Sequence, residues 1–150
     1  MGHDEPVGQA PGSFNDDLRP VIVVNGHGLT LGVDAGGNWL VWGHHHAACP
    51  VQNQLLWLLP LLERPPEVVA PGIAAIADGT ELLSALVRSA LESASQYWAS
   101  MALTWLETGY PVGGFAEILA LLKDSPLQPQ PVRHRALQLW RKAHPGGVAG

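Results

Sequence analysis

Cysteine is nearly missing from this chain of 150 residues, in which Cys49 is the only one. One cysteine cannot close an internal disulfide, so a disulfide-stapled secreted scaffold is excluded. The first residues lack the basic start and apolar stretch of a secretory signal, and no apolar run reaches the ~20 residues that a membrane-spanning helix needs. We therefore expect a soluble, cytoplasmic protein that does not bind membranes.

Charge is also scarce. Asp, Glu, Lys and Arg make up only 14% of the residues, and eight basic residues against 13 acidic ones give a net charge of −5. Binding to a nucleic acid needs a basic footprint, and we expect none here. The cations are unevenly placed, because Arg133, Arg135, Arg141 and Lys142 fall in the last 20 residues with no acid among them. They suit either a partner's surface or simply the negative end of a helix dipole.

Motifs that carry chemistry are missing as well. The chain has no G-x-G-x-x-G and no G-x-x-x-x-G-K-[ST] phosphate loop, and its glutamates are scattered without a close pair. Cys49 has histidines nearby, and Asp34 or Asn38 could orient one of them, but a small cysteine before Pro50 is more typical of a structural residue. We predict no catalytic residues, and an enzyme is the less favoured interpretation.

A strand pattern opens the structured part of the chain. "VIVV" (21–24), "LTLGV" (29–33) and "WLVWG" (39–43) are short β-type segments, separated by the turn sequences "NGHG" and "DAGGN". Asn-Gly readily adopts the positive φ angles of a tight hairpin, so these segments predict a three-stranded antiparallel meander. One apolar face of such a sheet needs a cover, which the rest of the chain must supply.

The rest of the chain predicts helices. We expect a short apolar helix over 51–64 that Pro60 kinks or ends, a proline-rich connector over 64–72, and later helices over 113–124 and 132–142. The predicted buried residues of these last two helices are Phe115, Ile118, Leu119, Leu122, Val132, Ala136, Leu139 and Trp140. The predicted fold is α+β: a small N-terminal three-stranded antiparallel meander packed against four to five α-helices. It forms one domain over 20–144, between flexible tails at 1–19 and 145–150.

The strongest helical pattern covers residues 80–108. Apolar residues recur there at spacings of three and four, on a stripe of Leu83, Val87, Ala90, Ala94, Tyr97, Met101 and Trp105. The segment "SASQ" (93–96) is where we expect a bend or a break. If Leu83, Val87, Ala90 and Ala94 lie uncovered in the monomer, the chain would be a structural subunit that forms a homo-oligomer through this helix.

Three histidines precede the cysteine in "WGHHHAAC" (42–49). His44 and His46 would share one face of a continuing strand, Cys49 follows three residues later, and His27 reaches the same edge if the second and third strands pair. Imidazole and thiolate are zinc ligands, so His27, His44, His46 and Cys49 form a candidate metal site with zinc as its cofactor. The alternative is an ordinary strand end without a metal.

Six tryptophans are present, and tryptophan and arginine are enriched where proteins bind other proteins. Trp39 and Trp42 are three apart in one strand and should point to opposite faces. The candidate partner-binding residues are Trp42, Trp98, Trp105, Arg133, Arg135, Trp140 and Arg141. The alternative is that most of these rings fill the core.

These observations favour a non-catalytic protein-binding module that acts as an adaptor, an inhibitor or an immunity-type partner of another protein. It would use no cofactor. The alternatives are a small metal-binding protein or metal-dependent enzyme built on residues 44–49, and the oligomerising subunit described above.

Overall fold

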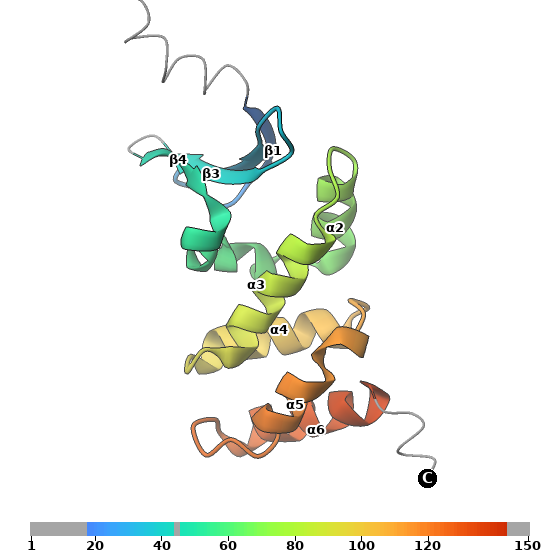
Figure 1. The fold of residues 1–150 in the computed structure, drawn as a ribbon. Helices are drawn as coiled ribbons and strands as arrows, with labels where there is room; N and C mark the ends of the chain where they lie inside the picture. Colours follow the sequence, from blue (N-terminus) through green and yellow to red (C-terminus); the bar gives the residue numbers. More distant parts are fainter. Residues whose placement is uncertain (1–17, 44–45, 144–150) are drawn as a thin grey trace, which may run out of the picture.

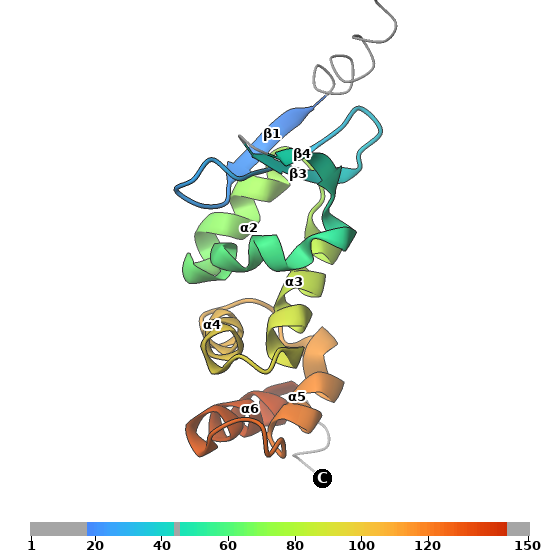
Figure 2. The same cartoon turned by 90° about the vertical axis from the view of Figure 1, so that its left-hand side faces the viewer.

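The computed structural model describes residues 18–43 and 46–143. The elements stack along one direction, with the sheet at one end and the C-terminal helices at the other (Figures 1 and 2). Strands come first in the chain and helices follow, which confirms the predicted α+β class. None of the helices in the described residues has the length and apolar character that crossing a bilayer requires.

The sheet has four antiparallel strands in the order β1-β2-β3-β4. They are β1 (Arg19–Val23), β2 (Thr30–Val33), β3 (Trp39–Gly43) and β4 (His46–Pro50). Three strands were predicted, and β4 is the additional one. It pairs with β3, with Cys49 opposite Val41 and Pro50 opposite Leu40. The sequence "HAACP" has no β-branched residue and ends in proline, so only its pairing with β3 makes it a strand. Proline is tolerated there because β4 is an edge strand.

The two faces of the sheet differ. Leu31 and Val41 are partners across β2 and β3, and both are fully buried in the core. On the opposite face Gly32 lies directly beneath the ring of Trp42, whose Cζ3 would be 2.9 Å from a Cβ at that position. Trp39 faces the helices, where its ring lies near Gly79. The two tryptophans therefore point to opposite faces, as the alternation of the strand requires.

The segment after the sheet forms two 3₁₀ helices in place of the single helix predicted over 51–64. It comprises η1 (Val51–Asn53) and η2 (Leu55–Glu63), and Pro60 lies inside η2 without ending it. With three residues per turn, leucines three apart eclipse one another. Its buried residues form two such pairs: Leu58 with Leu61, and Leu59 with Leu62.

The predicted connector over 64–72 is also wrong, because α2 (Pro66–Ala74) begins within it. Pro66 is the first helical residue, where the missing N–H has no partner to lose and the fixed φ angle suits a helix. Val69 and Ile73, four residues apart, are both fully buried. The prolines of this segment therefore mark the start of a helix, whereas the prediction took them as the sign of an irregular connector.

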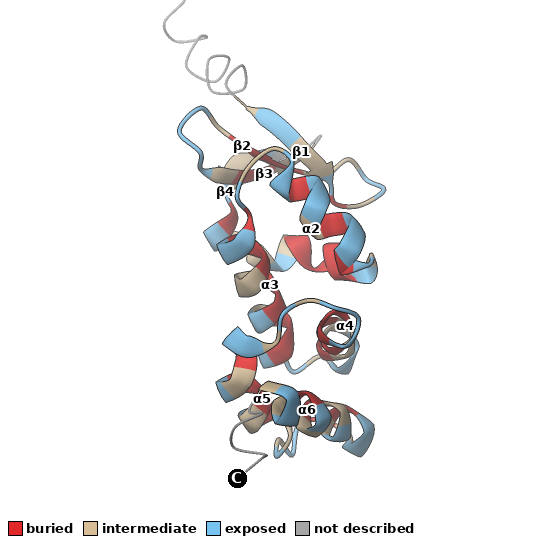
Figure 3. Cartoon of the chain, turned by 90° about the vertical axis from the view of Figure 1, so that its right-hand side faces the viewer, coloured by how far each residue is buried: buried red, intermediate tan, exposed pale blue. Residues whose placement is uncertain are grey.

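The predicted helix 80–108 is two helices, α3 (Thr80–Glu92) and α4 (Gln96–Glu107). The break falls at the expected place, and Ser95 caps α4 by accepting the N–H of Trp98 at 3.2 Å. Leu83, Val87 and Ala90 are buried by the chain itself, and Figure 3 shows both buried and exposed segments along α3. Three of the four residues on which the oligomerising subunit depended are therefore covered within the monomer, and the fourth, Ala94, is exposed between α3 and α4.

The last three elements are η3 (Gly113–Phe115), α5 (Ala116–Leu122) and α6 (Gln130–Ala143). The helix predicted over 113–124 thus opens with a 3₁₀ turn. Helix α5 packs on α3 and α6, and α6 also packs on α4. Their predicted core residues are buried with one exception, Trp140, which is half-buried: Phe115, Ile118, Leu119, Leu122, Val132, Ala136 and Leu139.

Candidate functional site

The predicted metal ligands lie at one end of the sheet. Strand pairing brings the β1–β2 turn, which carries His27, to the same end as Gly43 and His46. His27 is exposed, while Cys49 is half-buried and its thiol donates to the Val41 carbonyl at 3.7 Å. His44 and the side chain of His46 lie outside the described residues. Within the described part, no three His, Cys, Asp or Glu side chains gather to hold a metal ion, so zinc stays a prediction.

Asp34 and Asn38, named above as residues that could orient a catalytic histidine, are hydrogen-bonded to each other in the turn between β2 and β3. Asp34 Oδ1 accepts the backbone N–H groups of Gly36 and Asn38, both at 2.9 Å, and so closes the β2–β3 turn. These bonds, with that of Asn38 first among them, lower the pKa of Asp34. A carboxylate held in its own turn in this way stabilises the hairpin.

Trp105 is a core residue and not a partner contact, because only 1% of its surface is exposed. Its indole N–H donates to the Arg64 carbonyl at 2.8 Å. The ring packs against Tyr110 with centroids 5.4 Å apart. A side chain covered in this way offers nothing to a partner, which corrects its place among the candidate binding residues.

Trp42 and Trp98 are half-buried. Trp98 packs on the core and meets the ring of Tyr97 edge-on, with centroids 4.8 Å apart. Trp42 covers Gly32 on the outer face of the sheet. The two rings lie on β3 and α4, in separate layers of the stack (Figure 2), so they do not form one surface.

Arg135 joins α6 to α4. Its guanidinium donates two hydrogen bonds to the Glu107 carboxylate, from Nε to Oε2 at 2.9 Å and from Nη2 to Oε1 at 2.8 Å. Nη2 also donates to Thr104 Oγ1 at 2.9 Å and to the Ser100 carbonyl at 3.3 Å. With its Nε and Nη2 donors used inside the molecule, Arg135 links α6 to α4.

The remaining candidates gather at the C-terminal end of the molecule. Lys123 Nζ lies 4.9 Å from the centroid of the Trp140 ring, a cation–π contact, and pairs with Asp124 at 2.9 Å. Arg133, Trp140 and Arg141 are seven and eight residues apart on α6 and so share one side of that helix. We call these four side chains, Lys123, Arg133, Trp140 and Arg141, the α6 basic surface.

The cations of the α6 basic surface differ in their partners. Arg141 is exposed, and Arg133 is half-buried with its Nε buried and without a hydrogen-bond partner. Neither forms an ion pair or hydrogen bond with the part of the chain that the structure describes. Within the described residues these two guanidinium groups therefore have no ionic partner, and they share one side of α6 with an aromatic ring that contacts Lys123.

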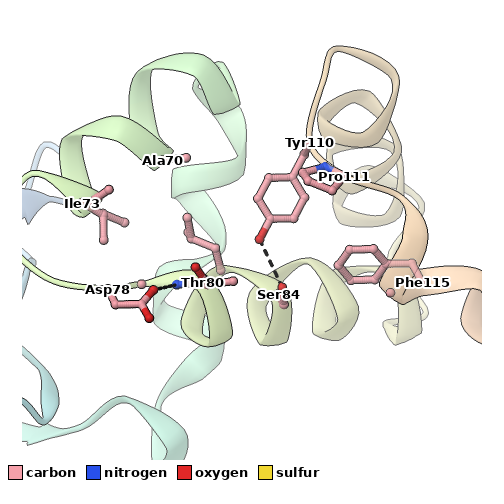
Figure 4. A pocket seen from close by; sticks show the side chains of 12 residues that line it. Ala70, Ile73, Asp78, Thr80, Ser84, Tyr110, Pro111 and Phe115 are labelled. Carbon is pink, nitrogen blue, oxygen red and sulfur yellow. Dashed lines mark hydrogen bonds between the residues drawn. The ribbon is translucent and has the colours of Figure 1, made fainter.

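A cavity of about 320 Å³ was not predicted from the sequence. It lies between α2, the start of α3 and the loop that precedes η3 (Figure 4). Its walls are mainly apolar, and its polar groups include Asp78 and the hydrogen-bonded hydroxyls of Ser84 and Tyr110, 3.2 Å apart. These two hydroxyls are 26 residues apart in the sequence, so no local motif could have revealed them.

Comparison of the chain with protein-family models, with curated proteins and with solved structures gave no match. Its function must therefore be inferred from the chemistry of these surfaces.

Proposed function

We propose that this protein is a non-catalytic protein-binding module that holds an acidic segment of a partner protein on the α6 basic surface. The observation that carries the proposal is that Arg133 and Arg141, on the same side of α6 as Trp140, meet no carboxylate in the part of the chain that the structure describes. Arginine binds carboxylates through two parallel hydrogen bonds, and Trp and Arg dominate the binding energy of many interfaces.

Charge complementarity selects an acidic partner. Arg133 and Arg141 meet no carboxylate within the described residues, so an added Asp or Glu would gain a partner without displacing one. Nucleic acid is the less suitable anion, because the whole chain carries −5 and repels an extended polyanion. An adaptor, an inhibitor or an immunity-type protein of the cytoplasm would all work through such a surface.

A selection from a random peptide library tests the proposal and requires no named partner. The immobilised full chain should enrich peptides rich in Asp and Glu, and the purified peptides should bind about tenfold more weakly to an Arg133→Glu/Arg141→Glu variant. Their affinity should also fall when the salt concentration rises.

The matched control is Arg19→Glu, which reverses another exposed arginine on β1, at the opposite end of the stack. Enriched peptides should bind this variant almost as well as the original chain. Peptides without acidic residues, or equal losses in the two charge-reversal variants, would contradict the proposal.

A second candidate function is zinc binding, favoured by the strand pairing that brings the His27 turn and His46 to one end of the sheet. Elemental mass spectrometry of protein purified without a nickel step should then find about one zinc per chain. A His44→Ala/His46→Ala variant should lose that zinc and unfold more easily. Protein without zinc, equally stable in both forms, would remove this candidate.

A further inference from the structure

The cavity near Ser84 has the size and lining of a small-molecule site. Its volume of about 320 Å³ falls within the range of about 300–1,000 Å³ typical of ligand pockets. Tyr110 and Phe115 supply aromatic walls, with ring centroids 6.2 Å apart, and Ile73 and Leu83 supply aliphatic ones (Figure 4). An aromatic ligand suits walls of this kind.

The hydroxyl pair leaves one proton donor unused. Ser84 and Tyr110 each carry one O–H, and the single hydrogen bond between them uses one of the two protons, whichever group donates. Neither hydroxyl has another hydrogen-bond partner within the described residues. Both groups line the cavity, so the spare donor can serve a ligand oxygen there.

Charge at the cavity disfavours an anionic ligand. Asp78 lines it, and the backbone N–H of Thr80, which donates to Asp78 Oδ1 at 3.0 Å, is the main cause of its lowered pKa. The carboxylate is therefore ionised at neutral pH. Arg88, the cation on α3, donates from Nη2 to the Gly114 carbonyl at 3.2 Å and lies over the Phe115 ring, so its charge has partners within the protein.

We infer that this cavity binds a small neutral aromatic molecule through one carbonyl-type oxygen, which accepts the spare proton of the Ser84–Tyr110 pair. The site lies between α2 and α3, apart from the α6 basic surface, so the two proposals stand or fall separately. A partner's apolar side chain is the competing occupant, and it would have no need of the hydroxyl pair.

Acetophenone and ethylbenzene are the probes, because they have nearly the same shape and differ in the acceptor oxygen. In ¹H–¹⁵N NMR titrations of the full chain, acetophenone should saturate and shift the amides of residues 78–84 and 110–115. It should bind about fivefold more tightly than ethylbenzene, the ratio expected for one hydrogen bond. Benzoate, which adds a negative charge, should bind more weakly than either.

Two variants test the location and the hydrogen bond. Ala74 lines the cavity, so Ala74→Leu should abolish acetophenone binding, whereas Ala75→Leu, one residue further and outside the lining, should not. In Ser84→Ala/Tyr110→Phe, acetophenone and ethylbenzene should bind equally. The amide spectrum of each variant without ligand shows whether it is folded.

The inference is overturned by any of three results. These are no saturable binding of acetophenone to the original chain, binding unchanged in a folded Ala74→Leu protein, or equal affinities of acetophenone and ethylbenzene in the original chain. The last result would assign the cavity to apolar side chains. Charge reversal at Arg133 and Arg141 should leave acetophenone binding unchanged, which separates this test from that of the proposed function.

Discussion

The indole N–H of Trp105 donates to the backbone carbonyl of Arg64 across 2.8 Å, and this bond joins α4 to the segment that connects η2 with α2. The two residues are 41 positions apart in the chain. Arg64 in turn donates from Nη2 to the Val24 carbonyl at 3.2 Å, next to the sheet. A short chain of hydrogen bonds therefore links the middle helix layer to the sheet through one arginine.

Trp105→Phe should destabilise the protein by about 2 kcal/mol, because it removes buried ring volume and leaves the Arg64 carbonyl without its donor. Urea unfolding followed by circular dichroism measures the change. Trp98→Phe is the control: this ring is only half-buried, and its loss should cost less than half as much. Equal losses would show that the Trp105 bond adds nothing.

Gly32→Ala should destabilise the sheet by about 2 kcal/mol, since the new Cβ would collide with the Arg19 carbonyl and with the ring of Trp42. Gly26→Ala is the matched control, because nothing lies within 4 Å of a Cβ at that position. Its stability should change by less than about 0.5 kcal/mol. Thermal unfolding of both variants measures the two changes in stability. Similar melting temperatures would contradict the packing described for Trp42.

Removing the Arg135–Glu107 pair should weaken the contact between α6 and α4. The two side chains are 30% and 38% exposed, so a double-mutant cycle with Arg135→Ala and Glu107→Ala should give a coupling energy of about 1 kcal/mol. This coupling energy lies at the upper end of the range for exposed ion pairs, because two hydrogen bonds join the side chains and Arg135 also bonds to Thr104. A coupling energy near zero in low salt would show that the pair contributes nothing to stability.

Tyr97 should titrate above the ordinary tyrosine pKa of about 10. Its hydroxyl donates to Glu63, and this hydrogen bond is the main cause that raises its pKa, because ionised tyrosine would lose the bond and face a carboxylate. The raised pKa belongs to the folded state, so its contribution to stability is complete below about pH 10 and is lost as the pH rises through the folded pKa.

NMR of the Tyr97 ring carbons measures this titration directly. Glu63→Gln should move the Tyr97 pKa back towards about 10, because the negative charge is removed while a hydrogen-bond acceptor remains. An unchanged Tyr97 titration would show that Glu63 does not act on it in solution.

Short-range sequence patterns were sufficient for the elements whose signals are local. Two turns, one with Asn-Gly and one with Asp-Ala-Gly-Gly, separate the three predicted strands, and Asn25 and Asp34 accept turn N–H groups as such residues do. Residues Phe115, Ile118 and Leu119 lie at helical spacing and are buried. The α+β class and the break near Ser95 followed from patterns of the same kind.

Packing between distant segments settled the remaining features. Strand β4 exists because β3 offers its free edge, and α2 contains prolines whose positions suit a helix start. Aromatic composition could not separate buried Trp105 from half-buried Trp140, since both lie on amphipathic helices. The cavity joins Ser84 to Tyr110 across 26 residues. Such long-range contacts depend on how helices stack, because a residue's own neighbours in the chain do not say which other element will cover it.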